Sequence, residues 1–193
     1  MIYMCLSIVF LMNPMDNLKT FNPDQTASVN HGVALAEELV SNFYKMSATQ
    51  WLGRKYDIKT LSDLSPEETV HGPFAQIIRY QGQRKDALLS SSAYDFYKIC
   101  LQDHAILATL EQSPNIKLLP FILYIVTHEL IHIVRFSKFL QNFDASQQEM
   151  MAEETRVHEI TQKILSPVCV DGLADVLEFY GRWRQPFEDL RNV

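Results

Sequence analysis

Residues 125–134 read IVTHELIHIV and set three ionisable side chains in a run that otherwise looks built for burial. His128 and His132 are four residues apart, so on a helix their imidazoles lie on one face, about one turn from each other. Imidazole nitrogen binds zinc at about 2.0–2.1 Å, and this spacing lets both rings reach the same ion. Burial of a polar group without a partner costs roughly 2–7 kcal/mol, and a bound ion would offset that cost.

Glu129 is a candidate proton acceptor beside these two ligands. It lies about 100° around the helix from His128, next to the ion rather than on it, where its carboxylate can reach a water molecule on the metal. Continuous apolar residues flank the trio, which disfavours a chance pattern, an exposed polar stripe or a buried hydrogen-bonded cluster. The pattern therefore predicts a site for one zinc ion, with Glu129 as general base.

A second helix is predicted downstream, over residues 149–165. Its apolar residues recur at helical spacing and form one stripe: Met150, Met151, Val157, Ile164 and Leu165. Glu154, His158 and Thr161 fall inside that stripe. A carboxylate and a histidine on a core-facing stripe need partners as much as the first trio does.

The two helices can meet if residues 121–165 form an antiparallel, metal-binding helical hairpin. At a rise of about 1.5 Å per residue, Glu154 and His158 are then level with His132 to within about one turn. The sequence therefore offers a third metal ligand at the right height. Spacing alone does not decide which of the two residues it is.

The two segments together, HELIH at 128–132 and ExxVH at 154–158, resemble the zincin metallopeptidases and, within them, the gluzincins. In the gluzincins an HExxH helix supplies two zinc ligands. A glutamate on a following helix supplies the third, often four residues before an acid that orients a ligand histidine. The resemblance covers only about residues 125–165. It implies that Glu154 is the third ligand and that the fold is α+β and predominantly helical, with the HExxH helix packed on the ligand-bearing helix.

The chain departs from the gluzincin pattern at one position, where His158 replaces the acid. Either Glu154 binds zinc and His158 supports a ligand, or His158 is the third ligand and Glu154 supports it. The family spacing favours Glu154. The metzincins are excluded, because their pattern requires glycine and histidine where this chain has Arg135 and Lys138.

These residues predict zinc-dependent hydrolysis of a peptide bond in a peptide or protein substrate. Three protein ligands leave the fourth position of zinc to water, and Glu129 accepts a proton from that water. A further donor usually stabilises the oxyanion, and the candidates are His104, Tyr180 and Arg182.

Two other classes of protein stay open. If Glu154 and His158 both bind, the four-ligand site is closed and the chain is a non-catalytic, zinc-stabilised interaction module. Glu129 and His132 also form the E-x-x-H motif of di-iron carboxylate proteins. Such proteins need a second E-x-x-H, and Thr155 stands where its glutamate would be.

The elements that carry the site are expected to be helices. One apolar-biased helix runs from about residue 121 to 140. The next starts at a capping box formed by Ser146 and Glu149, and Pro167 stops it. A last helix is predicted over 171–183.

The segments before these helices are more mixed. Residues 22–30 indicate a turn-rich lead-in to an amphipathic helix over 31–46. A cap at Ser65, followed by proline and two acids, predicts the start of a short helix. The segment 74–82 fits either a strand or a helix.

A small antiparallel sheet is predicted from two segments rich in aromatic and branched residues, 93–101 and 104–112, with Gln102 and Asp103 at the turn. Periodicity over segments of this length does not exclude helices. The expected fold is therefore α+β, with the metal-binding helices accompanied by a small sheet.

Composition limits the classes of protein that fit. The 193 residues suit a single domain over 1–193, and 47% hydrophobic with 21% charged residues is ordinary for a soluble globular chain. The formal charge of −6 argues against a nucleic-acid partner. The three cysteines are far apart and lack a C-x-x-C pair, which disfavours a disulfide framework and a cysteine zinc site. Free thiols favour a reducing compartment, so we expect a cytoplasmic protein.

The N-terminal run MIYMCLSIVFLM is apolar but too short to span a bilayer alone. It lacks the basic region of a secretory signal. Residues 1–20 could be disordered, could dock on the protein or a membrane, or could be an extended start, with Met15 opening the native chain. We do not favour association of residues 1–20 with a membrane.

Overall fold

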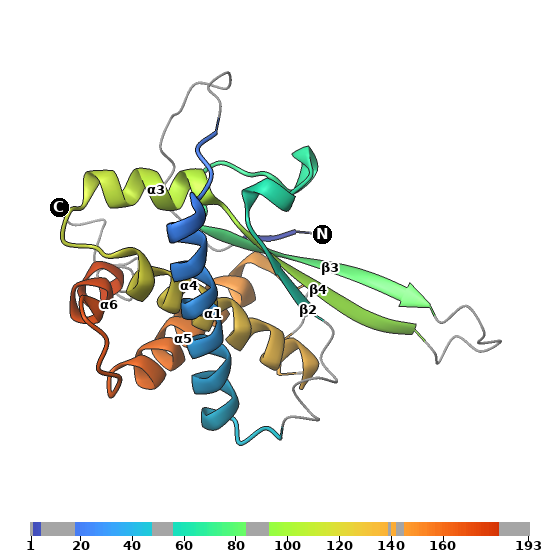
Figure 1. The fold of residues 1–193 in the computed structure, drawn as a ribbon. Coiled ribbons are helices and arrows are strands. Elements are labelled where there is room, and N and C mark those ends of the chain that lie inside the picture. The colour runs from blue at the N-terminus through green and yellow to red at the C-terminus, as the bar shows by residue number, and fades with distance from the viewer. Residues whose placement is uncertain are drawn as a thin grey trace, which may run out of the picture. The chain divides into compact units, whose positions relative to one another are not determined.

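The computed structural model is α+β and mostly helical, as predicted (Figure 1). It describes six parts of the chain: residues 2–4, 18–47, 56–83, 93–138, 140–141 and 145–181. Two compact units are present. The sheet unit comprises Met1–Asn22 and Lys45–Thr109, and the helical unit comprises Pro23–Tyr44 and Leu110–Val193. The single-domain expectation over 1–193 stays a prediction.

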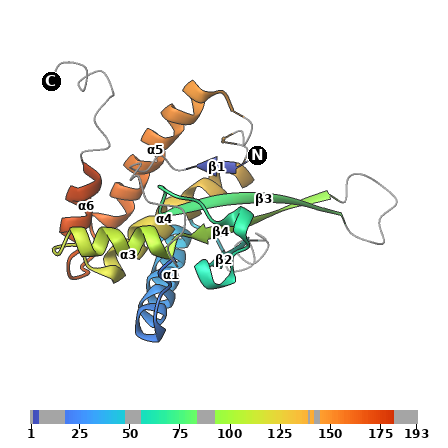
Figure 2. The ribbon, with the colours of Figure 1, turned by 90° about the horizontal axis from the view of Figure 1, so that it is seen from above.

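The sheet unit is built on a mixed sheet, not the purely antiparallel one that was predicted. Its strands are β1 (Ile2–Met4), β2 (Tyr56–Lys59), β3 (Ala75–Gln83) and β4 (Ala93–Leu101), in the order β1-β3-β4-β2. The long strands β3 and β4 lie side by side (Figure 2) and pair antiparallel, whereas β2 pairs with β4 in parallel. The ambiguous segment 74–82 is thus a strand, and residues 2–4 of the N-terminal run pair with β3.

The prediction of a strand over 104–112 is wrong, because this segment is the helix α3 (Asp103–Gln112). The chain turns at Asp103, whose carboxylate accepts hydrogen bonds from the backbone N–H groups of Phe21 and Leu61. The carbonyl of Gln102 accepts hydrogen bonds from the backbone N–H groups of Ala105 and Ile106, which begins the helix. β4 therefore takes β3, not 104–112, as its antiparallel neighbour.

The predicted cap at Ser65 starts a single helical turn, η2 (Pro66–Glu68), that places a buried carboxylate over one face of the sheet. Glu68 accepts hydrogen bonds from Tyr80 Oη at 2.7 Å, from Lys98 Nζ and from the backbone N–H of Ser65 at 2.9 Å. The hydrogen bond from Lys98 is the main reason that the pKa of Glu68 falls from 4.5 to about 2.

Glu68→Gln is expected to lower the free energy of unfolding by about 1.5–3 kcal/mol at pH 7, because it removes a hydrogen bond between charged groups. A carboxyl with a depressed pKa stabilises the folded state above its unfolded value of 4.5 and loses that effect as pH falls towards about 2. Urea unfolding should therefore show a difference between wild type and variant that shrinks from pH 5 to pH 2.

The matched control is Glu67→Gln, at the exposed neighbouring position in the same turn. Hydrogen bonds within the turn lower the pKa of the Glu67 carboxyl as well, but this group is exposed to solvent, so its variant should lower the urea midpoint at pH 7 much less than Glu68→Gln does. A difference between Glu68→Gln and wild type that stays constant with pH would show that the charge of Glu68 does not stabilise the sheet unit.

The helical unit is organised around one central helix. Its helices are α1 (Pro23–Phe43), α4 (Leu118–Ser137), α5 (Gln147–Leu165) and α6 (Leu173–Gly181), and each of the other three packs against α4. Figure 1 shows α1 crossing α4, with α5 and α6 following on the chain. The last helix thus begins two residues later than predicted, and residues 182 and 183 lie outside the described residues.

The predicted lead-in at 22–30 is wrong, because α1 already begins at Pro23. Proline suits the first helical position since its missing N–H needs no partner there, and Asp24 favours the positive end of the helix dipole. The helix packs closely on α4 at Gly32, where an added Cβ would lie only 2.8 Å from Ile122 Cγ2.

α4 is the buried core of the helical unit. It begins at Leu118, three residues before the predicted start, and tolerates Pro120 in its first turn. Every residue from Pro120 to Phe136 is buried. By length and composition this helix could cross a membrane, but 89% of its 18-residue apolar stretch is buried inside the protein. That burial is compatible with the core helix of a soluble protein.

α5 starts as predicted, at the capping box. The backbone N–H of Ser146 donates to Glu149 Oε2 at 2.9 Å, and the backbone N–H of Glu149 donates to Ser146 Oγ at 3.4 Å. These bonds satisfy amides that have no partner inside the helix. They fix where α5 begins and therefore which of its residues face α4.

Candidate metal centre

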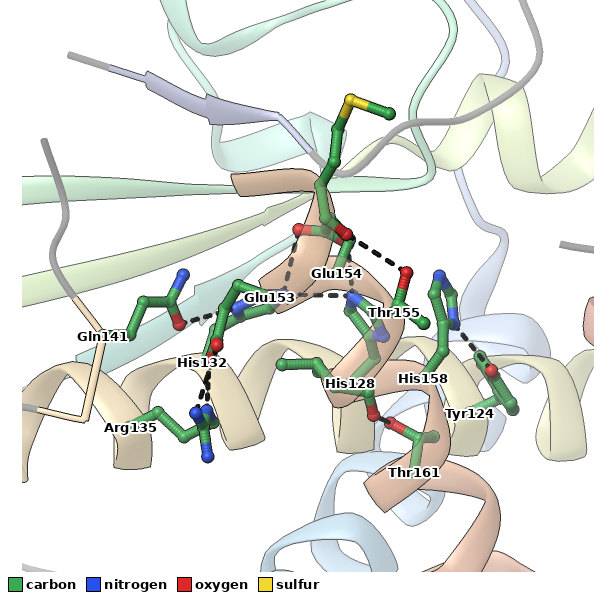
Figure 3. Close-up of polar contacts among 12 residues, drawn as sticks. Tyr124, His128, His132, Arg135, Gln141, Glu153, Glu154, Thr155, His158 and Thr161 are labelled. Carbon is green, nitrogen blue, oxygen red and sulfur yellow. Dashed lines mark hydrogen bonds and ion pairs between the residues drawn. The ribbon is translucent and has the colours of Figure 1, made fainter. Parts of the chain in front are cut away.

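The four candidate ligands, His128, His132, Glu154 and His158, come together where α5 packs on α4 (Figure 3). Tyr124 contacts His158, and His132 contacts Glu154, so residue numbers rise along one helix as they fall along the other. The two helices therefore run in opposite senses at the site, which is the arrangement that a hairpin over 121–165 requires.

Four ligand-type atoms, one from each histidine and two from Glu154, lie close together. His128 Nε2 lies 3.2 Å from His132 Nε2 and 3.3 Å from Glu154 Oε2, and His132 Nε2 lies 3.2 Å from Glu154 Oε1. Two atoms that bind one tetrahedral ion at about 2.0–2.1 Å stand about 3.3–3.4 Å apart. Each of these three separations is close to the spacing of two ligands on one tetrahedral zinc ion, and each histidine faces a different oxygen of Glu154.

His158 is a fourth candidate ligand and lies beside His128. His128, Glu154 and His158 form a buried group whose ligand atoms all lie within 4.8 Å of one another and could hold a metal ion. Nδ1 of His158 is hydrogen-bonded to Tyr124 Oη at 2.8 Å. The ring centroid of His128 lies 4.4 Å from that of His158 and 4.8 Å from that of His132, so the structure brings both His132 and His158 close to His128.

The second nitrogen of His132 is also engaged. Its Nδ1 lies 3.2 Å from Gln141 Oε1, an amide oxygen that can only accept, so Nδ1 carries the proton. The lone pair of the neutral ring is then on Nε2, which points to His128 and Glu154. A hydrogen bond that fixes the tautomer and direction of a ligand ring is typical of metal-binding histidines.

The electrostatics of the site are those of a deeply buried ion pair. His132 is 0% exposed and Glu154 is 8% exposed. Burial opposes the charge on both groups, but His132 together with His128 lowers the pKa of Glu154 well below its usual value. In the same way burial lowers and Glu154 raises the pKa of His132, with a net rise to about 9. A metal ion would take the place of the imidazole proton, since only the neutral ring binds metal.

Glu129 lies on the buried surface of α4 next to these ligands, with 3% of its surface exposed. Its burial raises the pKa of its carboxyl, while His128 and His132 act in the opposite direction. Among the described residues, the Glu129 carboxylate makes no hydrogen bond and no ion pair. The Glu129 carboxylate therefore lies near the candidate ligands and makes no polar contact that holds the described fold together.

The three candidate oxyanion donors fall in different places. The ring of Tyr180, on α6, stacks on Tyr124 with centroids 3.8 Å apart and lies 5.8 Å from the ring of His158. His104 belongs to the sheet unit, where it is buried against His71. Arg182 lies outside the described residues. Tyr180 therefore lies beside the candidate ligand His158.

Sequence reasoning missed one pair beside the site. Arg135 is buried on α4 and makes an ion pair with the buried Glu153 on α5. The prediction that Met151 belongs to the core-facing stripe is wrong, because its side chain is 36% exposed and Glu153 occupies the buried face instead. A signal was present in Arg135, a charged residue inside an apolar run, but its partner could not be read from spacing alone.

No protein-family model, curated protein or solved structure matches this chain. The likeness to the gluzincins therefore rests on the residues of HELIH and ExxVH alone.

Proposed function

We propose that this protein is a zinc-dependent metallopeptidase with one zinc ion per chain. His128, His132 and Glu154 are the ligands, and Glu129 is the general base. The observation that carries the proposal is the close approach of the two Nε2 atoms to each other and to the two carboxylate oxygens of Glu154, at 3.2–3.3 Å. This spacing matches a tetrahedral zinc site, and the residues are those that a gluzincin would use.

In the proposed reaction Glu129, Gln141 and Tyr180 each have a separate role. Bound zinc would act as a Lewis acid on the scissile carbonyl and would lower the pKa of a water molecule to about 7. Glu129 receives a proton on its carboxylate and can pass it to the leaving amine, a role that its raised pKa and lack of other contacts suit. Gln141 holds His132 in the required tautomer, and Tyr180 is the favoured oxyanion donor because it lies beside His158.

The substrate class follows from the resemblance, since zincins hydrolyse peptide bonds. The compartment follows from the thiols, because Cys100 and Cys169 are both free. Free cysteines are usual in a reducing environment. We therefore propose peptide or protein substrates in the cytoplasm.

A second candidate function is supported by the position of His158. If His158 Nε2 and Glu154 both bind, the site has four protein ligands and is a structural, non-catalytic zinc site. The burial of all four side chains favours this alternative: His128, His132, Glu154 and His158 are each 8% exposed or less. A di-iron centre has less support, because the described residues contain one group able to hold a metal ion and not two.

His158→Gln separates the catalytic site from the closed one. In the proposed peptidase, His158 is not a ligand. The variant should keep one zinc per chain, lose no more than about 100-fold in zinc affinity, and keep the absorption spectrum of the cobalt-substituted protein. Elemental analysis, chelator competition and visible spectroscopy measure these quantities, and peptide hydrolysis is followed in parallel.

The matched control is Tyr124→Phe, which removes the hydrogen bond to His158 Nδ1 and leaves both rings in place. A cobalt spectrum that changes in His158→Gln but not in Tyr124→Phe would identify His158 as a ligand. Together with no detectable peptide hydrolysis by the wild type, that result would favour the closed structural site.

A further inference from the structure

A buried ion pair lies directly beside the candidate ligands. Arg135 donates from Nε and from Nη2 to the two carboxylate oxygens of Glu153, with Nη2 at 3.1 Å from Oε2. Arg135 is 8% exposed and Glu153 is 6% exposed. Figure 3 shows the pair next to His132, with one partner on each helix.

Each partner of this pair adjoins a candidate ligand along its own helix. Arg135 follows His132 by three residues on α4, so the two side chains lie on neighbouring positions of one face. Glu153 directly precedes Glu154 on α5. Any shift of α5 along α4 that moved Glu154 away from the histidines would therefore also break the contact between Arg135 and Glu153.

Stability alone does not account for such a pair. Desolvation of two buried charges costs about as much as their attraction returns, and well-packed apolar residues in their place are often neutral or stabilising. What the two-pronged contact between guanidinium and carboxylate adds is direction, because its two parallel hydrogen bonds form in only one relative orientation. The carboxylate of Glu153 is held from its own helix as well, by Arg156 Nη1 at 3.0 Å from Oε2.

We propose that the pair of Arg135 and Glu153 positions the metal centre by fixing the height of α5 against α4, so that Glu154 meets both histidines. This inference rests on the proposed zinc site and names the residues that align it. Neither partner is a ligand or a catalytic residue; both act through the placement of Glu154.

The test separates positioning from stability with the double variant Arg135→Met and Glu153→Leu. We expect the metal-free double variant to unfold at the same urea concentration as the metal-free wild type, or at a higher one. Its zinc dissociation constant, measured by competition with a chelator, should rise about 10–100-fold. A pair with a purely structural role would leave zinc affinity unchanged once the helices pack.

A second variant keeps the test valid if the double variant does not fold. Arg135→Lys retains the charge but loses the two-pronged contact, so zinc affinity should again fall by about tenfold or more. The control is Lys163→Ala, which removes an exposed cation from the same helix α5 and does not touch the pair, and it should bind zinc like the wild type. Wild-type affinity in Arg135→Lys, or in a folded double variant, would overturn the inference. A wild-type protein that binds no zinc would instead overturn the proposed function.

Discussion

Replacing Glu129 with glutamine is expected to stop peptide hydrolysis while one zinc ion per chain stays bound. Glutamine has nearly the shape of glutamate but cannot accept a proton, and general-base catalysis contributes about 10²–10⁴-fold. The side chain makes no hydrogen bond or ion pair with the described residues, so the change breaks no structural contact. We expect kcat to fall by about 10²–10⁴-fold, with the zinc content from elemental analysis unchanged.

A control for this variant is Glu159→Gln, which removes an exposed carboxylate from the ligand-bearing helix α5. It should leave both kcat and zinc content at their wild-type values. Full activity in Glu129→Gln would exclude Glu129 as the general base. Loss of zinc from the same variant would show that Glu129 helps to hold the metal, contrary to its predicted place beside the ion.

The meeting of the candidate ligand residues could be predicted because it depends on local patterns. The spacing of His128 and His132 on one helix face needs no tertiary information, and the capping box at Ser146 fixes the start of α5. With both helices placed, the rise per residue predicts that Glu154 reaches the level of His132. The structure places His132 Nε2 and Glu154 Oε1 3.2 Å apart.

The rest of the fold depends on contacts between distant parts of the chain. The apolar spacing over 104–112 fits a strand or a helix, and the decision is made at Asp103. Its carboxylate binds the backbone of Phe21, 82 residues away, and of Leu61, 42 residues away. The short strand β2 (Tyr56–Lys59) carries too few residues to show an alternating pattern, so its parallel pairing with β4 could not be predicted either.

The pairing of Arg135 with Glu153 shows the same limit inside the site. A charged residue in an apolar run indicates that a partner exists, but Glu149, Glu153 and Glu154 were all within reach of a helical hairpin. Only the observed height of α5 decides between them: Glu154 meets the histidines, and Glu153 therefore faces Arg135. The position of α5 along α4 therefore sets both contacts at once: that of Glu154 with His132 and that of Glu153 with Arg135.

Replacing His132 with alanine is expected to abolish the response of protein stability to zinc. An ion that binds only the folded wild type raises its free energy of unfolding by about 2.7 kcal/mol at a free zinc concentration 100 times the dissociation constant. The variant lacks one ligand of three, and Glu154 loses the partner that most lowers its pKa. Thermal unfolding with and without zinc measures the effect: the midpoint of the wild type should rise, and that of His132→Ala should not move.

The control for this experiment is His31→Ala, at an exposed histidine on α1, and it should respond to zinc like the wild type. A response retained by His132→Ala would remove this residue from the ligand set and favour the group of His128, Glu154 and His158. A wild-type midpoint that ignores zinc would instead leave His132 and Glu154 as a buried ion pair that stabilises the packing of α5 on α4, because its charges are already balanced without a metal.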